Sequence, residues 1–304
     1  MTRRRELLSH LRGLNQVRQI IDAMKRLSFI ETRRLDGRLD SEDAVIHAIE
    51  TAATGLLDTH PQLADTGAAL PITWIALGSE RGFCGDFNER VAERLAADVR
   101  ASVPVDPHII AVGARLITCL GNDARVTATL PGASVADETD AVLAAIVDAL
   151  DAERRAHGPS RVHVVHYENE RQEPIVTWLL PPFRAAATAE AASSEPPLLQ
   201  MAPTDLLLAL GDQYLYAALR RILDGALMAE NQRRVRQLEG AAQHLDERVA
   251  TLVRRGNQLR QEEIIEEIEV ILLSSATAPP WAPPSRSPQP TTSRAPSPST
   301  DAGV

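Results

Sequence analysis

A glycine-rich turn is the part of this sequence that comes nearest to a ligand-binding motif. Gly78, Gly82 and Gly85 lie in it, after a short apolar run typical of a buried strand and before a helical segment. Backbone amides at a helix start attract phosphate, but this glycine spacing matches neither the dinucleotide-binding pattern nor the P-loop pattern. The turn formed by Arg81, Gly82, Cys84 and Gly85 is therefore predicted to be structural, with nucleotide binding as the alternative.

The other reactive side chains give weak signals. No group that would lower the pKa of Cys84 can be identified, so a nucleophilic role is not favoured. His163 and His166 are three residues apart on a predicted strand and should face opposite sides, which argues against a shared metal. Cys84 and Cys119 are too few for a disulfide framework, as in a reducing compartment. We expect no catalytic residue, no cofactor and no metal.

Charge is unevenly distributed along the chain. The 304 residues carry a net charge of −9, which argues against a general nucleic-acid binder. Residues 3–38 nevertheless hold ten basic and four acidic side chains. These arginines could bind phosphate, but aromatic residues are scarce among them. A solvated helix face is expected for the acidic run of Glu262, Glu263, Glu266, Glu267 and Glu269.

The middle of the chain alternates between strand and helix patterns. Strands are predicted at 71–77, 108–113, 161–167 and 175–180, and helices at 87–100 and 137–155. This alternation is typical of an α/β domain with a largely parallel sheet. No apolar run approaches the roughly 18–20 residues of a membrane span, and no secretory signal is expected at the start.

Two long proline-free segments flank this domain. Residues 1 to about 58 are predicted to form one helix, with a stripe of apolar side chains along one face that includes Leu14 and Ile21. A second helix is predicted to run to about residue 277, with Thr204 as a plausible N-cap. The second helix shows a 3.5-residue repeat, typical of a coiled-coil seam, at Leu238, Ala242, Leu245, Val249, Leu252, Gly256 and Leu259.

Antiparallel pairing of the two helices would bury both stripes and give a rod on an α/β base. The predicted parts are an N-terminal coiled-coil helix (1–60), the α/β domain (70–182), a linker (183–203), a C-terminal coiled-coil helix (204–277) and a disordered tail rich in proline and serine (278–304).

Three separated stretches resemble the gamma subunit of F-type ATP synthases. Residues 14–25, LNQVRQIIDAMK, are similar to that family's opening helix with its T-x-x-I-T-x-A-M-K pattern. Residues 79–88, SERGFCGDFN, are similar to its turn SDRGLCGGFN. Residues 229–267 are similar to its final helix, S-E…R-M…N-x-x-R-Q-x-x-I-T-x-E. The chain departs from the family at Glu80, Phe83, Asp86, Val235 and Ile265, which leaves open a divergent member such as a subunit of an alternative rotary ATPase.

The resemblance implies a central-stalk rotor subunit that transmits torque between an ion-driven c-ring and a catalytic ring of alpha and beta subunits. The implied partners are the alpha, beta and epsilon subunits and the c-ring in a heteromultimer, without nucleic acid and with membrane contact only through the complex. Catalysis would reside in the beta subunits. The implied location is the cytoplasmic side of a bacterial inner (plasma) membrane, as a peripheral protein. Contacts with the ring are implied for Met24, Lys25, Arg234, Gln261 and Ile265, the last of which cannot donate a side-chain hydrogen bond.

Two other functional classes remain open from the residues. One is a stand-alone α/β nucleotide-binding enzyme with coiled-coil oligomerisation arms, and the other is a plain coiled-coil scaffold. Bound nucleotide or hydrolysis by the isolated chain would favour the first class.

Overall fold

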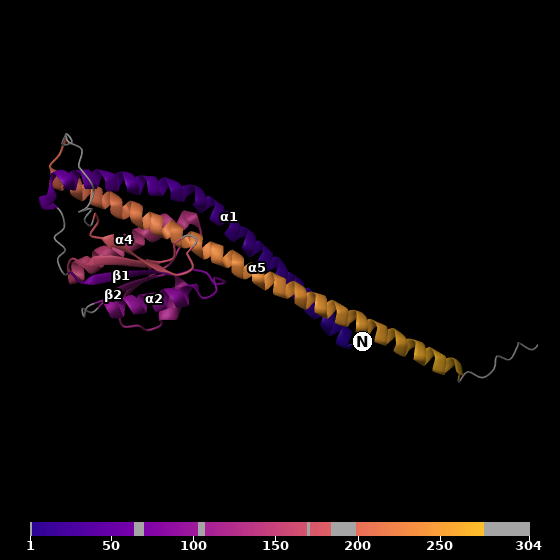
Figure 1. The fold of residues 1–304 in the computed structure, drawn as a ribbon. Coiled ribbons are helices and arrows are strands. Elements are labelled where there is room, and N and C mark those ends of the chain that lie inside the picture. Colours follow the sequence, from indigo (N-terminus) through magenta and orange to yellow (C-terminus); the bar gives the residue numbers. More distant parts are fainter. Residues whose placement is uncertain (1, 64–69, 103–106, 169–170, 184–198, 277–304) are drawn as a thin grey trace, which may run out of the picture.

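Two long helices dominate the architecture (Figure 1). The computed structural model describes residues 2–63, 70–102, 107–168, 171–183 and 199–276. Helix α1 spans Thr2–Thr59 and helix α5 spans Pro203–Ala276. The first residue of α5 is Pro203, one residue earlier than predicted. Proline suits the first position of a helix because the amide hydrogen that it lacks would have no partner within the helix there. Thr204 therefore lies inside the first turn of α5 and is not its N-cap, as the sequence had suggested.

A five-stranded sheet forms the centre of the base. Its order is β3-β2-β1-β4-β5, and only β5 runs antiparallel to its neighbour, β4. The first four strands are parallel because helices connect them. The strands are β1 (Ile72–Leu77), β2 (His108–Val112), β3 (Val126–Leu130), β4 (Arg161–His166) and β5 (Ile175–Leu180).

Shorter helices complete the base. They are α2 (Phe87–Ala101), α3 (Ala114–Leu120), α4 (Thr139–His157) and the 3-10 turns η1 (Pro61–Leu63) and η2 (Ala136–Glu138). The sequence patterns predicted neither α3 nor β3. Helix α3 has only seven residues, and β3 is an edge strand on which Thr127 and Thr129 are exposed.

The side chains of β1 divide the core into two layers. Trp74 and Ala76 pack with residues of α2 and α3 on one face of the sheet. Ile75 and Leu77 pack on the other face with residues of α4 and with the 218–226 part of α5. Because neighbouring strand residues point to opposite faces, both faces of β1 are buried, and all of its residues except Thr73 are apolar. The long helix α5 is thus part of the core of the base before it leaves it.

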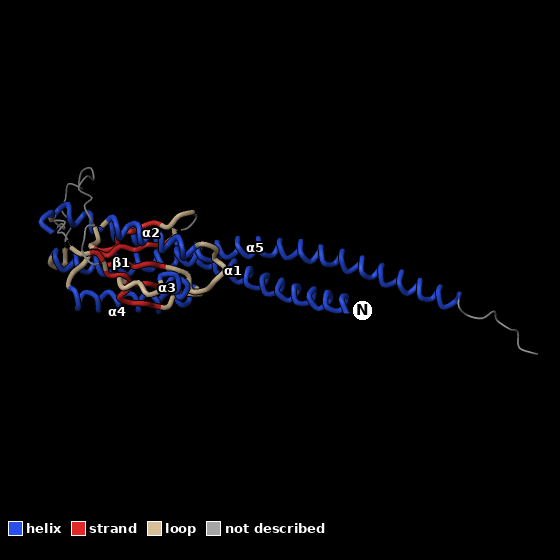
Figure 2. Tube along the Cα trace, turned by 90° about the horizontal axis from the view of Figure 1, so that it is seen from below, coloured by secondary structure: helices blue, strands red, loops and turns tan. Residues whose placement is uncertain are grey.

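Helix α1 runs along α5 in the opposite direction and continues past the base as a stalk (Figures 1 and 2). The ion pairs between the two helices follow this antiparallel alignment. As the residue number of the α1 partner increases, the residue number of the α5 partner decreases. They join Arg4 to Glu263, Arg18 to Asp246, Lys25 to Glu239 and Asp43 to Arg221. Helix α5 extends beyond the start of α1, so its last turns have no helix beside them in Figure 2.

Some predicted segments fall outside the described residues. Most of the predicted linker (residues 184–198) and the predicted disordered tail (278–304) belong to this group. Among the described helices, none combines the length and apolar character needed to cross a membrane.

Candidate functional site

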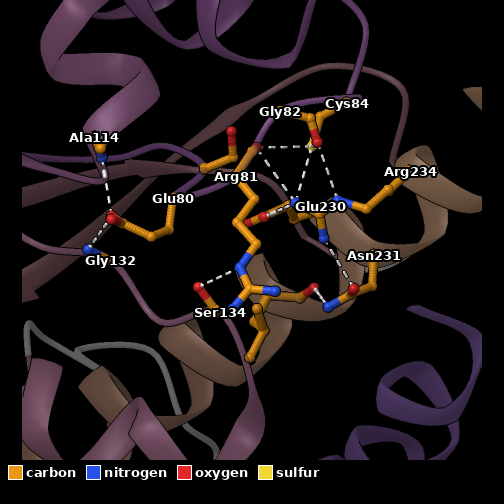
Figure 3. Close-up of polar contacts among 12 residues, drawn as sticks. Glu80, Arg81, Gly82, Cys84, Ala114, Gly132, Ser134, Glu230, Asn231 and Arg234 are labelled. Atoms are coloured by element: carbon orange, nitrogen blue, oxygen red, sulfur yellow. Dashed lines mark hydrogen bonds and ion pairs between the residues drawn. The ribbon is translucent and has the colours of Figure 1, made fainter. Parts of the chain in front are cut away.

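The predicted structural turn meets α5 where that helix leaves the base (Figure 3). We call the turn, residues 78–85, and the facing α5 residues Glu230, Asn231 and Arg234 the junction. Glu230, Asn231 and Arg234 are all buried, with 2–4% of their surface exposed. Three buried polar side chains on one helix need internal partners, and the turn supplies those that Arg234 finds outside α5.

Arg234 is the centre of the junction. Its Nε donates to the carbonyl oxygen of Gly82 at 3.1 Å, and its Nη2 donates to that of Arg81 at 3.3 Å. Nη2 also lies 3.3 Å from Cys84 Sγ. Within α5, Nη1 donates to Asn231 Oδ1 at 3.0 Å, and Nη2 pairs with the Glu230 carboxylate. The guanidinium fork therefore ties the turn to the helix through several donors at once.

Burial sets the ionisation of the groups around Arg234. It raises the pKa of Glu230 to about 7, and the adjacent Arg234 charge opposes this shift. Burial, with the nearby Glu230 charge, also raises the pKa of the Cys84 thiol to about 11. A thiol with such a pKa is protonated at neutral pH, so Cys84 is a poor nucleophile.

Several backbone amides beside the turn are already bound within the chain. Glu80 Oε2 accepts from the amide of Ala114, the first residue of α3, at 3.0 Å and from the amide of Gly132 at 2.8 Å. The Ser79 amide donates to Asn88 Oδ1 at 2.9 Å. A carboxylate thus occupies the start of α3, where an anionic ligand would otherwise be favoured.

The glycines of this region allow close backbone packing. A Cβ on Gly78 would lie 2.2 Å from Leu116 Cβ. A Cβ on Gly113, which has a φ of +102°, would lie 2.6 Å from the carbonyl oxygen of Gly78. The start of the turn therefore rests directly on α3 and on the end of β2.

Part of the predicted seam lies at the contact between α1 and α5. Ile21 and Leu238 are buried in one cluster with Ala242, against which Met24 and Leu245 also pack. Partial burial is found for Leu14, Leu245, Val249, Leu252 and Leu259. Val253, beside Leu252, points outward and is 45% exposed.

The five residues implied to contact a ring do not share one surface. Met24 is half-buried against α5, and Lys25 Nζ lies 2.5 Å from Glu239 Oε2. Arg234 is buried in the junction and already bonded within the chain. Gln261 and Ile265 are exposed near the end of α5. The contacts with a ring therefore stay predictions, and the geometry gives Arg234 an internal role that its sequence did not reveal.

The end of α5 is unusually apolar for an exposed helix. Large apolar side chains there are between 44% and 70% exposed, namely Ile264, Ile265, Ile268, Val270, Ile271, Leu272 and Leu273. We call this segment, residues 264–273, the apolar tip. The glutamates around it are exposed or half-buried, as expected for a solvated face. Exposed apolar surface of this kind marks an interaction site.

The two strand histidines lie on opposite faces of the sheet. His163 packs against the rings of Trp74 and Trp178. His166 is buried, with Nε2 2.8 Å from Thr177 Oγ1, and burial lowers its pKa to about 4. The two imidazoles cannot share a metal, as their spacing predicted.

A second buried charge cluster lies between α1 and α5 and was not predicted. Asp224 is fully buried, and both of its carboxylate oxygens lack a hydrogen bond. Arg38 Nη1 lies 3.9 Å from it, and Arg220 Nε donates to Glu42 Oε1 at 3.2 Å. Burial and the neighbouring Asp224 charge raise the pKa of Glu42 to about 7. Only the pairing of the two helices brings these groups together, so neither helix alone signals the cluster.

Comparison with known proteins agrees with this architecture. Residues 3–278 match the family model described as ATP synthase. The ATP synthase gamma chain of Saccharopolyspora erythraea is 24% identical, over 90% of this chain and 96% of its own length. The ATP synthase gamma chain of Neisseria gonorrhoeae is 21% identical, over 90% of this chain and 98% of its own length.

Solved structures show the same fold. A chain of the Euglena gracilis mitochondrial ATP synthase (OSCP/F1/c-ring, rotational state 3) superposes with a TM-score of 0.60 at 15% identity, covering 90% of this chain and 94% of that one. A chain of the rotor of the same enzyme gives a TM-score of 0.56 at 15% identity, covering 86% of this chain and 99% of that one.

Proposed function

The chain belongs to the gamma-subunit family of ATP synthases, and on that premise we propose how its structure transmits torque. It is the rotor subunit of the central stalk. We propose that α1 and α5 form an antiparallel coiled coil that works as a stiff shaft between a c-ring and a ring of alpha and beta subunits. The base would rest on the c-ring side together with an epsilon subunit.

One observation carries this proposal: α5 belongs to the core of the base at 218–226 and also forms the stalk as far as the apolar tip. A single uninterrupted helix connects the two, so a rotation of the base has to reach the tip. The junction adds a second attachment at Arg234, which limits twisting of α5 against the sheet. Ion pairs such as Arg18–Asp246 and Arg4–Glu263 join the helices farther out.

The apolar tip supports a contact with the catalytic ring. We propose that Gln261 and Ile265 contact the ring directly, because both are exposed at the end of α5. Ile265 offers only an apolar contact, which favours sliding over a fixed hydrogen bond. Met24 and Lys25 lie closer to the base. Lys25 is paired with Glu239 of α5, so we propose that at this level the ring contacts the face of α1 that points away from α5.

We further propose that this subunit is not itself catalytic. Glu80 and Asn88 occupy three backbone amides beside the turn, and the Cys84 thiol is protonated. These contacts disfavour the rival hypothesis of a stand-alone nucleotide-binding enzyme. We also propose that the subunit is located at the cytoplasmic face of a bacterial inner membrane. The gamma chains to which it is similar come from bacteria, Saccharopolyspora and Neisseria.

Reconstitution tests the proposal. The full chain would be combined with the alpha and beta subunits of its own organism, and ATP-driven rotation of a bead attached to the base would be followed. We expect rotation in the complete assembly and no ATP hydrolysis by the isolated chain. Hydrolysis by the isolated chain, with no assembly with alpha and beta subunits, would favour the enzyme hypothesis instead.

A further inference from the structure

Three side chains that bind metals well converge at one end of the base. His108 is the first residue of β2, and Glu153 and His157 lie in the last turns of α4. Their ligating atoms all lie within 4.8 Å of one another. Glu153 Oε2 is 3.1 Å from His108 Nδ1 and 3.0 Å from His157 Nδ1. The spacing of Glu153 and His157 on a helix places both on the same face.

From this arrangement we propose that the base binds one divalent transition-metal ion, best suited to Zn²⁺, through His108, Glu153 and His157. Two imidazole nitrogens and one carboxylate oxygen are a donor set that Zn²⁺ accepts, and a fourth position is left for water. The proposal is independent of the rotor function.

The surroundings of His108 support a ligand at this point. Its Nδ1 is buried and makes no aligned hydrogen bond, although Glu153 Oε2 is only 3.1 Å away. A metal ion would use the lone pair of this nitrogen. The side chains of His108 and Glu153 are 23% and 13% exposed, so the two inner ligands are largely screened from solvent.

There is room beside the three side chains for the ion and its water. A cavity of about 240 Å³ is lined by His108, Glu153 and His157 together with Thr73 and Ser160. Thr73 Oγ1 and Ser160 Oγ lie 2.8 Å apart on this wall and offer hydroxyl groups to a metal-bound water. His157, with half of its side chain exposed, can rotate to complete the site.

The site would have a structural effect. Thr73 and His108 are paired in register at the start of β1 and β2, at the opposite end of the sheet from the junction. A bound ion would fasten the carboxyl end of α4 to the amino end of β2. The base would then be held at both ends of its sheet, by the metal at one end and by Arg234 at the other.

Titration of the full chain with Zn²⁺, after treatment with EDTA, tests the site. We expect one equivalent to bind and to raise the melting temperature, and Mg²⁺ to do neither. His157→Ala should weaken binding by at least about tenfold, and His108→Ala by a similar factor. The matched control is His47→Ala, which removes an exposed histidine of α1 and should leave binding unchanged.

Two readouts keep the result decisive. His157 is half exposed, so its variant should keep the wild-type circular dichroism spectrum even if His108→Ala misfolds. Co²⁺ in the wild-type site should give the strong visible absorption of a four-coordinate ion, and the His157 variant should lose it. Equal Zn²⁺ affinity of the wild type and the folded His157 variant would overturn the proposal.

Discussion

Arg234 joins parts of the chain that lie 150 residues apart, because its guanidinium contacts both α5 and the turn that contains Cys84. The turn itself could be predicted from its glycines. The burial of Arg234 could not, because helical periodicity describes only neighbours on the same helix. The same reason hid Asp224, whose burial depends on α1. Sequence reasoning thus found the residues that shape the backbone and missed the buried charges.

Replacement of Arg234 tests the junction. Arg234→Met would leave the buried Glu230 carboxyl, which must then be protonated, and the carbonyl oxygens of Gly82 and Arg81 without their donor, so we expect the free energy of unfolding to fall by about 3 kcal/mol. Urea unfolding of the full chain measures this. Adding Glu230→Leu should restore much of the loss, because no unpaired charge then remains. The exposed Arg248→Met is the matched control and should change stability little. An equal effect of the two arginine variants would contradict the anchoring role.

Glu42 gives a prediction about pH. Its pKa is raised to about 7 in the folded chain, whereas an ordinary glutamate titrates near 4.5. Between these values the folded state binds more protons than the unfolded state, so stability falls as pH rises through this window. The expected loss is on the order of 2 kcal/mol.

The measurement compares unfolding curves of the wild type and Glu42→Gln between pH 4.5 and 7.5. The variant cannot release this proton and should lose less stability over the window. Subtracting the two curves removes other groups such as His166, whose lowered pKa acts in the opposite direction. Glu262→Gln, at an exposed site on α5, should follow the wild type. Parallel curves for wild type and Glu42→Gln would show that Glu42 titrates normally.

At the scale of elements, helices and strands with long or strongly apolar sequence patterns could be predicted, and short elements with weak patterns could not. The continuous apolar runs of β1 and β2 identified buried parallel strands, and the absence of proline identified both long helices. Helix α3 was missed because seven residues carry too little periodicity. The α5 start was misplaced by one residue because Thr204 satisfies the N-cap preference while Pro203 also fits a first helical position.

The contact between α1 and α5 is testable with neighbouring positions. Leu252→Asp would place a carboxylate in the contact, whereas Val253→Asp would place one on the outer face, where Val253 is 45% exposed. We expect Leu252→Asp, together with Leu245→Asp, to separate the helices and abolish coupled ATP synthesis in reconstituted vesicles. Val253→Asp should keep most of the activity. Equal activity of the two types of variant would refute the assignment of the seam.

At the scale of the whole molecule, the base and the stalk have opposite requirements. The base buries α5 in a core on one side of the sheet, while the stalk exposes the apolar tip at and beyond the start of α1. A monomeric protein gains nothing from such a tip, because exposed apolar surface is unfavourable in water. A covering surface would explain the tip, and the proposed surrounding ring would provide one while leaving the shaft free to turn.

Two truncations separate the tip from the tail. Removal of residues 277–304 should leave assembly intact, because the composition of that segment predicts little packing. Removal of 264–304 takes away the apolar tip as well, but none of the packing of the base, since the core residues of α5 end at Ala242. The shorter chain should therefore keep its melting temperature and lose at least about tenfold in affinity for the alpha and beta subunits, because several apolar contacts worth about 1 kcal/mol or more each are lost. Equal binding by both truncated chains would mean that the ring holds the shaft nearer the base, along the Met24–Lys25 segment.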